Sequence, residues 1–312
     1  DCYFENIGAA AIGPGHSLRV TLDGIHTKSC GLTFSWASID INNADHLTVK
    51  GLLAEACYMG LLLERVTWAD ISMLSRNSTW DGFLANSGVT DTYGDSRLTD
   101  IVLRALIDGF VNVGIVFKRS QAGQADPIRI KVDHPIVNMG STNALWAITL
   151  ENIDDSTVVS PTLYGTGTGT IGINLAPVTD TQVIGGRITA VTGIQESGAS
   201  ARNQIRHVDL RGSTTPYTTT STTTTILDCP GYDDVPAVSQ GDQVSITRKQ
   251  FRQRLGQELQ AIHLGTTTAS GSMHILTSAS GSHDMSESMK KRSVASGSRR
   301  NMSAIVFRAR WT

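Results

Sequence analysis

The sequence is poor in several features that mark large protein classes. Of its 312 residues only 17% are charged and 6% are aromatic, so it lacks the charge of a disordered tail or a coiled coil. No apolar run approaches the eighteen or so residues of a membrane span, because the densest, 52–63, is broken by Glu55. We therefore expect no membrane insertion. The chain opens on Asp1, with no leader-like segment, which indicates a piece of something longer.

Cysteine is also scarce and has no spacing suited to chemistry. The four cysteines show no CxxC pair and no nearby histidine pair, so neither a zinc site nor a redox motif is indicated. Cys57 lies in an apolar run and is most simply a small buried hydrophobe. The glycines of 165–169 lack the spacing of a dinucleotide-binding loop. We expect no metal and no cofactor.

The net charge of −2 hides a division along the chain. From residue 240 onward eleven basic residues face four acids, whereas the preceding part holds 15 basic and 24 acidic residues. The basic end lacks interleaved aromatics and any docking motif. We therefore expect it to serve packing or assembly, with no nucleic-acid partner.

An internal repeat runs through the first two thirds of the chain. Residues 147–164 align with residues 172–189 at a shift of 25, which superimposes Ile148 on Ile173, Leu150 on Leu175, Ile153 on Val178, Asp155 on Asp180, Val158 on Val183 and Leu163 on Ile188. Such self-similarity is typical of repeat architectures. The repeat opens with a small residue followed by apolar, any, apolar, and this opener recurs at Gly31, Gly60, Gly82, Gly114, Ala147 and Gly172 and fades at Gly193.

Within each copy, apolar residues alternate with other residues at every second position, which predicts short strands. The small and polar residues around these strands, including the opening glycines, predict turns. Repeats of about 20 to 30 residues with insertions favour a right-handed parallel β-helix. A twisted β-sandwich is the competing fold, but the exact shift favours the β-helix. We predict an all-β protein with a parallel β-helix over 1–212.

The end of the chain reads differently. Residues 213–225 are rich in threonine, so 213–239 is predicted as a connector, either an extended linker or an exposed strand ladder. Residues 244–264 contain one candidate amphipathic helix, and a recurring Ala-Ser-Gly-Ser phrase follows. We expect 240–312 to be a small, mostly-β module that serves oligomerisation.

A glycine-punctuated β-helix, a threonine-rich connector and a short β-rich end resemble bacteriophage tailspikes and related pectate-lyase-like proteins. The openers between Gly31 and Gly172 carry this resemblance, over about half of the chain, and no catalytic signature matches residue for residue. The resemblance implies a homotrimer, in a phage tail or otherwise extracellular, that binds bacterial surface polysaccharide and often cleaves it. Fold-level analogy is a weak warrant for chemistry.

Polysaccharide hydrolysis needs two carboxylates about 5 to 10 Å apart. Asp155 and Asp180 are neighbours by the repeat, but both lie in turn-like phrases where aspartate commonly caps its own backbone. Glu64, four residues after an opener, is a candidate catalytic acid whose plainer interpretation is a solvated surface residue.

The long coil between Gly82 and Gly114 holds the most suggestive insertion. It gathers Asp91 and Asp95, as candidate catalytic acids, with Tyr93 and Arg97, as candidate glycan contacts, and loops on rigid frameworks often carry function. The nearby Trp68 and Trp80 are further candidates for stacking on sugars. Each is also compatible with a core position, Trp80 less so because polar residues surround it.

Three hypotheses follow. The first is a depolymerase, a glycoside hydrolase that cuts capsule or O-antigen with paired carboxylates. The second is a structural or receptor-binding virion fibre that holds glycan without cutting it. The third is a secreted polysaccharide lyase, for which the sequence shows no cluster of acids with metal-ligand spacing near a lysine or arginine base.

Overall fold

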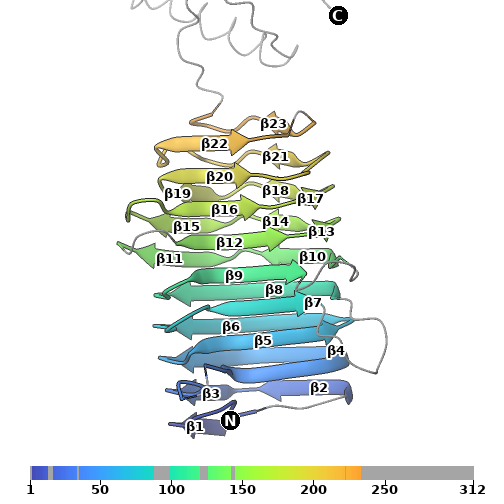
Figure 1. Ribbon diagram of the computed structural model, residues 1–312, viewed down its shortest axis with the longest axis vertical. Helices are drawn as coiled ribbons and strands as arrows, with labels where there is room; N and C mark the ends of the chain where they lie inside the picture. The colour runs from blue at the N-terminus through green and yellow to red at the C-terminus, as the bar shows by residue number, and fades with distance from the viewer. Residues whose placement is uncertain are drawn as a thin grey trace, which may run out of the picture. The chain divides into compact units, whose positions relative to one another are not determined.

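The computed structural model describes residues 2–12, 17–33, 35–87, 98–119, 126–141, 145–221 and 223–232. These residues belong to the first of the chain's two units, Asp1–Asp234. They contain strands and no helix, and every strand pairing among them is parallel. The prediction of an all-β parallel β-helix is confirmed; the predicted module over 240–312 lies outside the described residues. Figure 1 shows the strands stacked coil upon coil.

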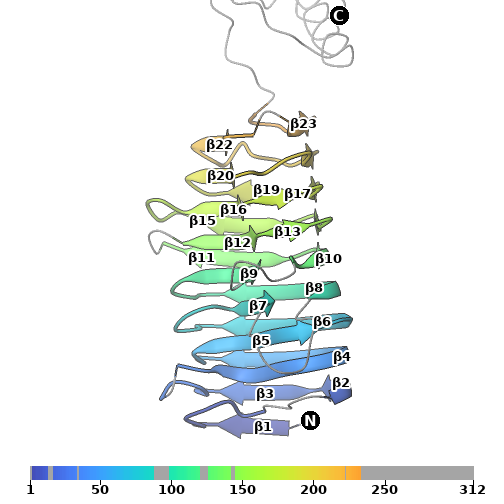
Figure 2. The ribbon, with the colours of Figure 1, turned by 45° about the vertical axis from the view of Figure 1, so that its right-hand side comes forward.

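Each coil contributes strands to three faces of the column (Figures 1 and 2). Face A consists of β1 (Cys2–Glu5), β3 (Ile25–Lys28), the ends of β4 (Ala37–Glu55), β6 (Ala69–Arg76) and β8 (Thr99–Asp108), and β11 (Ile136–Gly140), β15 (Thr162–Gly165) and β19 (Arg187–Thr189). Face B consists of the start of β4, β5 (Met59–Val66), β7 (Phe83–Ser87), β9 (Val113–Arg119), β12 (Trp146–Glu151), β16 (Ile171–Leu175), β20 (Thr192–Glu196) and β22 (Thr215–Thr219).

Face C consists of β2 (Ser17–Asp23), the middle of β4, the starts of β6 and β8, and β10 (Ile128–Asp133), β14 (Thr157–Val159), β18 (Gln182–Ile184), β21 (Gln204–Arg206) and β23 (Thr225–Leu227). The short strands β13 (Ile153–Asp154) and β17 (Val178–Thr179) lie between faces B and C. Figure 2 shows the same succession of coils from a second direction.

The core is a set of ladders, one residue from each coil stacked on its equivalent in the next. On face B the innermost ladder is Ile39, Leu61, Phe83, Ile115, Ile148, Ile173, Ile194 and Tyr217. From Ile39 to Ile194 these side chains are fully buried. Removing this apolar surface from water is the main stabilising contribution, at roughly 25 cal/mol per Å².

The predicted shift of 25 is the true pairing register for the apolar pairs from Ile148 with Ile173 to Leu163 with Ile188. The prediction for Gly31 is wrong, because Ser38 is the residue aligned with Gly60, and Gly31 lies in a turn with φ of +74°. Gly193, where the opener fades, is in full register with Gly172.

The aligned glycines do not form the turns that the pattern predicted. They allow neighbouring coils to lie close together. A Cβ at one of these positions would lie 2.4–2.7 Å from the carbonyl oxygen of the aligned residue on the next coil, at Gly60, Gly82, Gly114, Gly172 and Gly193. Inward side chains of face A crowd the same space, as Ile107 does at Gly82. Glycine is therefore selected for close approach between coils; Ala147 fills the aligned position with a buried methyl.

The threonine-rich stretch extends the column past residue 212. Thr215–Thr219 pairs with β20, and Thr225–Leu227 pairs with β21, so both strands lie within the predicted connector. Glu196, which is 2% exposed, holds this last coil in place by hydrogen bonds. Its carboxylate accepts hydrogen bonds from the side chains of Asn203, Tyr217, Thr219 and Thr224.

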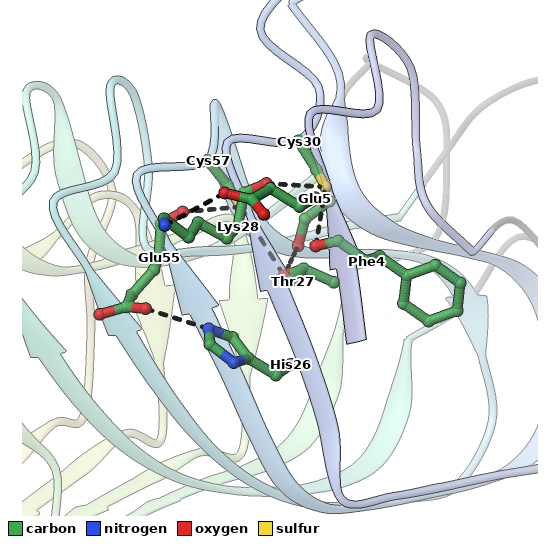
Figure 3. A network of polar contacts seen from close by, with 9 residues as sticks. Phe4, Glu5, His26, Thr27, Lys28, Cys30, Glu55 and Cys57 are labelled. Atoms are coloured by element: carbon green, nitrogen blue, oxygen red, sulfur yellow. Dashed lines mark hydrogen bonds and ion pairs between the residues drawn. The ribbon is translucent and has the colours of Figure 1, made fainter. Parts of the chain in front are cut away.

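Charged residues of alternating sign run along the outside of face A. Register places Glu5, Lys28, Glu55, Arg76 and Asp108 on successive coils. The Nζ of Lys28 lies 3.1 Å from an oxygen of Glu5. Figure 3 shows this contact beside Glu55 on the next coil.

The four cysteines are all free, and Cys30 and Cys57 are fully buried on consecutive coils. Their thiols lie 3.3 Å from the backbone oxygens of Lys28 and Glu55, respectively (Figure 3). Burial raises the pKa of the Cys57 thiol, which disfavours the reactive thiolate. The expectation that Cys57 is a small buried hydrophobe is confirmed.

Candidate functional site

Three aromatic residues lie in register on consecutive coils at the edge where face B begins. We call Trp36, Tyr58 and Trp80 the aromatic row. Trp36 and Tyr58 directly precede the paired residues Ala37 and Met59, and the pairing of β5 with β7 aligns Tyr58 with Trp80. Trp36 is 47% exposed and Trp80 is 42% exposed. The rings of Tyr58 and Trp80 are parallel within 4°, with centroids 6.0 Å apart.

The backbone behind Trp80 is held rigidly by the next coil. Its carbonyl oxygen accepts hydrogen bonds from the amides of Val111 and Asn112. The buried carboxylate of Asp81 accepts hydrogen bonds from Asn112 Nδ2, at 2.8 Å, and from the amide of Val113, at 3.0 Å. Burial raises the pKa of Asp81 although these hydrogen bonds oppose the shift. Trp80 is therefore presented to solvent on a fixed support.

Asp40 faces outward on face B, between the core residues Ile39 and Ile41. Its Oδ2 accepts a hydrogen bond of 2.7 Å from the indole Nε1 of Trp36. Its Oδ1 is buried and accepts no hydrogen bond from any residue in the described part of the chain. Burial raises the pKa of Asp40, against the lowering effect of the Trp36 hydrogen bond, since a poorly solvated carboxylate favours its neutral form.

Glu64, the predicted catalytic acid of β5, lies on the same outer face. Its register partner on the preceding coil is Asn42, whose Nδ2 donates a hydrogen bond of 2.9 Å to Glu64 Oε2. Arg65 Nη2 donates to Asn42 Oδ1 at 2.8 Å. The guanidinium therefore orients the amide so that its NH₂ group points at the Glu64 carboxylate.

Trp68 and Trp80, the two predicted sugar-stacking residues, lie at opposite edges of face B. Trp68 follows β5, at the end where Glu64 lies, and Trp80 precedes β7. Trp68 is 43% exposed, and its ring centroid lies 5.8 Å from that of His46. Both tryptophans are thus surface residues and neither is core. The remaining predicted site residues, Asp91, Tyr93, Asp95 and Arg97, lie outside the described residues.

Asp155 and Asp180 lie at corners of the column, as their turn-like phrases predicted. Both adopt a left-handed conformation, with φ of +51° and +53°, at equivalent corners. Asp180 accepts a bidentate pair of hydrogen bonds from Arg202, at 2.6 and 2.8 Å. This contact holds Asp180 in an ion pair at its corner.

A second charged group lies on the outer side of face C. Arg104 contacts Asp70 at 2.6 Å and Asp133 at 3.4 Å, and Lys131 contacts Asp133 at 3.1 Å. This group could not be predicted from the sequence, because only the pairing of β6, β8 and β10 brings its members together. The hydrogen bond with Asp70 raises the pKa of Arg104, so this guanidinium stays protonated and is not poised to act as a base.

The sequence interpretation missed Trp36, Asp40 and Tyr58. A usable signal existed, since Trp36, Tyr58 and Trp80 are separated by 22 residues each time. This 22-residue spacing was missed because the first opener was placed at Gly31. The residue that aligns with the later openers is Ser38, seven residues further along the chain.

No family model, no curated protein and no solved structure matches this chain. A parallel β-helix is compatible with polysaccharide-binding and lyase-type proteins. Over the described ranges, no group of three or more histidine, cysteine or acidic side chains could hold a metal ion. The same ranges contain no helix long and apolar enough to span a bilayer.

Proposed function

We propose that the protein is an extracellular polysaccharide-binding β-helix of the tailspike type, which holds a bacterial surface glycan against face B. The observation that carries the proposal is the aromatic row. Solvent-exposed aromatic rings with one apolar surface open suit the flat apolar faces of sugar rings. Their repetition on consecutive coils suits a ligand that is itself a repeating chain.

The support of the row favours binding with little rearrangement. Tyr58 and Trp80 are already parallel, and Asp81 and Asn112 hold the backbone around Trp80. A prearranged surface loses less conformational entropy when the ligand binds. Polar side chains beyond the row, on β4 and β5, supply hydrogen-bonding groups for sugar hydroxyls.

Within this proposal the protein is a homotrimeric part of a phage tail or another extracellular assembly, and hydrolysis by paired carboxylates is favoured over binding alone. The third hypothesis, a lyase, gains no support from face C, where Arg104 is ion-paired with two carboxylates. Light scattering tests the oligomer: a mass of three 33.4 kDa chains is expected, and a folded monomer would contradict the trimer.

The binding proposal is tested with Trp80→Ala. Purified capsular and O-antigen polysaccharides are titrated into the protein by calorimetry, and we expect about tenfold weaker binding, because removing a central aromatic contact costs on the order of 1–2 kcal/mol. The matched control is Tyr164→Ala, which removes a 51% exposed aromatic from face A. Equal affinities for the two variants, or no binding of any polysaccharide by the unaltered protein, would contradict the proposal.

A further inference from the structure

Two carboxylates stand diagonally across neighbouring strands on the outside of face B. Asp40 and Asn42 are two residues apart on β4, and Asn42 is the register partner of Glu64 on β5. One interstrand spacing and two residues of strand separate Asp40 from Glu64, or about 8 Å from Cα to Cα. In a glycoside hydrolysis that inverts the anomeric carbon, one carboxyl group protonates the leaving oxygen and a second, separate carboxylate activates a water molecule.

The surroundings of the two carboxylates differ in the way that an acid and a base require. The register neighbour of Asp40 on the next coil is the apolar Leu62. The Oδ1 of Asp40 is buried and has no hydrogen-bond donor among the described residues. An ionised carboxylate in that position lacks solvation on one side, which favours the protonated form, and the pKa of Asp40 is raised accordingly.

Glu64, by contrast, accepts a hydrogen bond from an oriented amide. Asn42 Nδ2 lies 2.9 Å from Glu64 Oε2, and Arg65 holds the other end of that amide. Hydrogen bonds donated to a carboxylate favour its ionised form. The two carboxyl groups therefore lie in unlike surroundings, one partly buried and one accepting a directed hydrogen bond, and such a contrast allows acid and base roles to be assigned.

We infer that Asp40 is the general acid and Glu64 the general base of a glycoside hydrolysis that inverts the anomeric carbon, with Trp36 positioning the sugar beside Asp40. This inference rests on the proposed function, since it requires that a glycan lies on face B. Trp36 contributes an exposed ring and an indole N–H bound to Asp40 Oδ2. Trp68 follows β5 beyond the corner at Arg65, and its ring lies beside His46.

The reaction balances with water as the only co-reactant. Asp40 Oδ2 gives its proton to the glycosidic oxygen while another lone pair of Oδ2 still accepts from Trp36. The bond between the anomeric carbon and that oxygen breaks, and the electron pair leaves with the oxygen. Glu64 takes a proton from water as the water oxygen bonds to the opposite side of the anomeric carbon. Exchange with solvent then returns a proton to Asp40 and removes one from Glu64.

The test uses Asp40→Asn and Glu64→Gln in the full chain, with Asp155→Asn as the matched control. The control replaces a corner aspartate in a left-handed conformation that asparagine tolerates. The substrate is the polysaccharide that the unaltered protein binds most tightly in calorimetry. New reducing ends give the rate, and proton NMR of the first products gives the anomeric configuration.

We expect both variants to release reducing ends at least 100-fold more slowly, while glycan affinity and Tm stay near those of the control. The first product should carry the inverted anomer. Retained configuration, or a rate for Asp40→Asn equal to that of the control, overturns the inference. Binding without release of reducing ends by the unaltered protein also overturns it and leaves the proposed binding function intact. Absence of binding overturns both.

Discussion

The lower coils, from β1 to β9, and the upper coils, from β10 to β23, build the same column in different ways. The lower coils contain the long strands, with nineteen residues in β4 and ten in β8, whereas no strand of the upper coils exceeds six residues (Figure 1). The aromatic row and the Asp40–Glu64 pair both lie on the lower coils. The positions equivalent to the row in the upper coils hold Leu145, Thr170, Val191 and Thr214.

This difference separates the regular framework from the candidate site. The upper coils repeat closely, and their polar residues fix corners or the last coil, as Asp180 and Glu196 do. The lower coils keep the inner ladders but place unusual residues on the outside. A repeat that is easily recognised therefore marks the framework, and the site lies where the repeat is least regular.

The largest effect should come from filling the glycine ladder of the upper coils. In Gly172→Val, the new Cβ would lie 2.3 Å from Ile188 Cγ2 and 2.5 Å from the carbonyl oxygen of Gly193. Because both neighbours are fixed in the core, we expect a loss of about 3 kcal/mol or more in the free energy of unfolding, measured by denaturant titration.

The comparison variant is Gly140→Ala, where nothing lies within 4 Å of the new methyl and only the positive φ of +62° is unfavourable. We expect a cost of about 1 kcal/mol there. Similar losses for both variants would show that the glycine ladder does not depend on close approach between coils.

An intermediate loss of stability is expected at Glu196, whose hydrogen-bond partners all lie in the upper coils. Glu196→Ala removes the carboxylate that accepts hydrogen bonds from the buried amide of Asn203 and from three hydroxyl groups. We expect a loss of about 2 kcal/mol, with faster hydrogen exchange confined to β22 and β23. Uniformly faster exchange over both sets of coils would contradict a role restricted to the last coil.

The same residue predicts a dependence on pH. Burial alone would raise the pKa of Glu196, but the hydrogen bonds from Tyr217, Asn203, Thr219 and Thr224 outweigh it and lower the pKa below its ordinary value of 4.5. The stabilisation is therefore fully present above pH 4.5 and is lost as the pH falls through the lower native pKa. Glu196→Gln should abolish this dependence in the exchange of β22 and β23.

The smallest effect is expected at the surface of the upper coils. Arg202→Ala removes the bidentate contact with Asp180, in which both side chains are largely exposed. Solvent and salt screen such pairs, so Tm should stay unchanged within error. A clear fall in Tm at low salt would show that corner ion pairs stabilise this region.

How far the sequence could be interpreted depends on where insertions fall. The pairing of Ile148 with Ile173 is exact because no insertion interrupts that part of the repeat. The error at Gly31 arose because this glycine, which has a positive φ and lies before β4, begins a false copy of the opener. The aromatic row was visible only after that error was corrected.

Other parts of the site could not be found without the three-dimensional register. Asp40 and Glu64 are 24 residues apart, and nothing local in the sequence shows that they share one face. Similarly, composition identifies Thr219 and Thr224 as members of a polar tract. Only the pairing of β20 with β22 shows that their hydroxyls converge on Glu196.

The alternating charges on face A bear on how the column folds. Coils of similar shape can pair with the wrong neighbour, and apolar ladders alone penalise such an error weakly. If β1 skipped one coil, Glu5 would lie against Glu55, and a skip by the next coil would place Lys28 against Arg76. Like charges in register repel. The alternating charges on the outside of face A therefore disfavour stacking of the first coils in the wrong order.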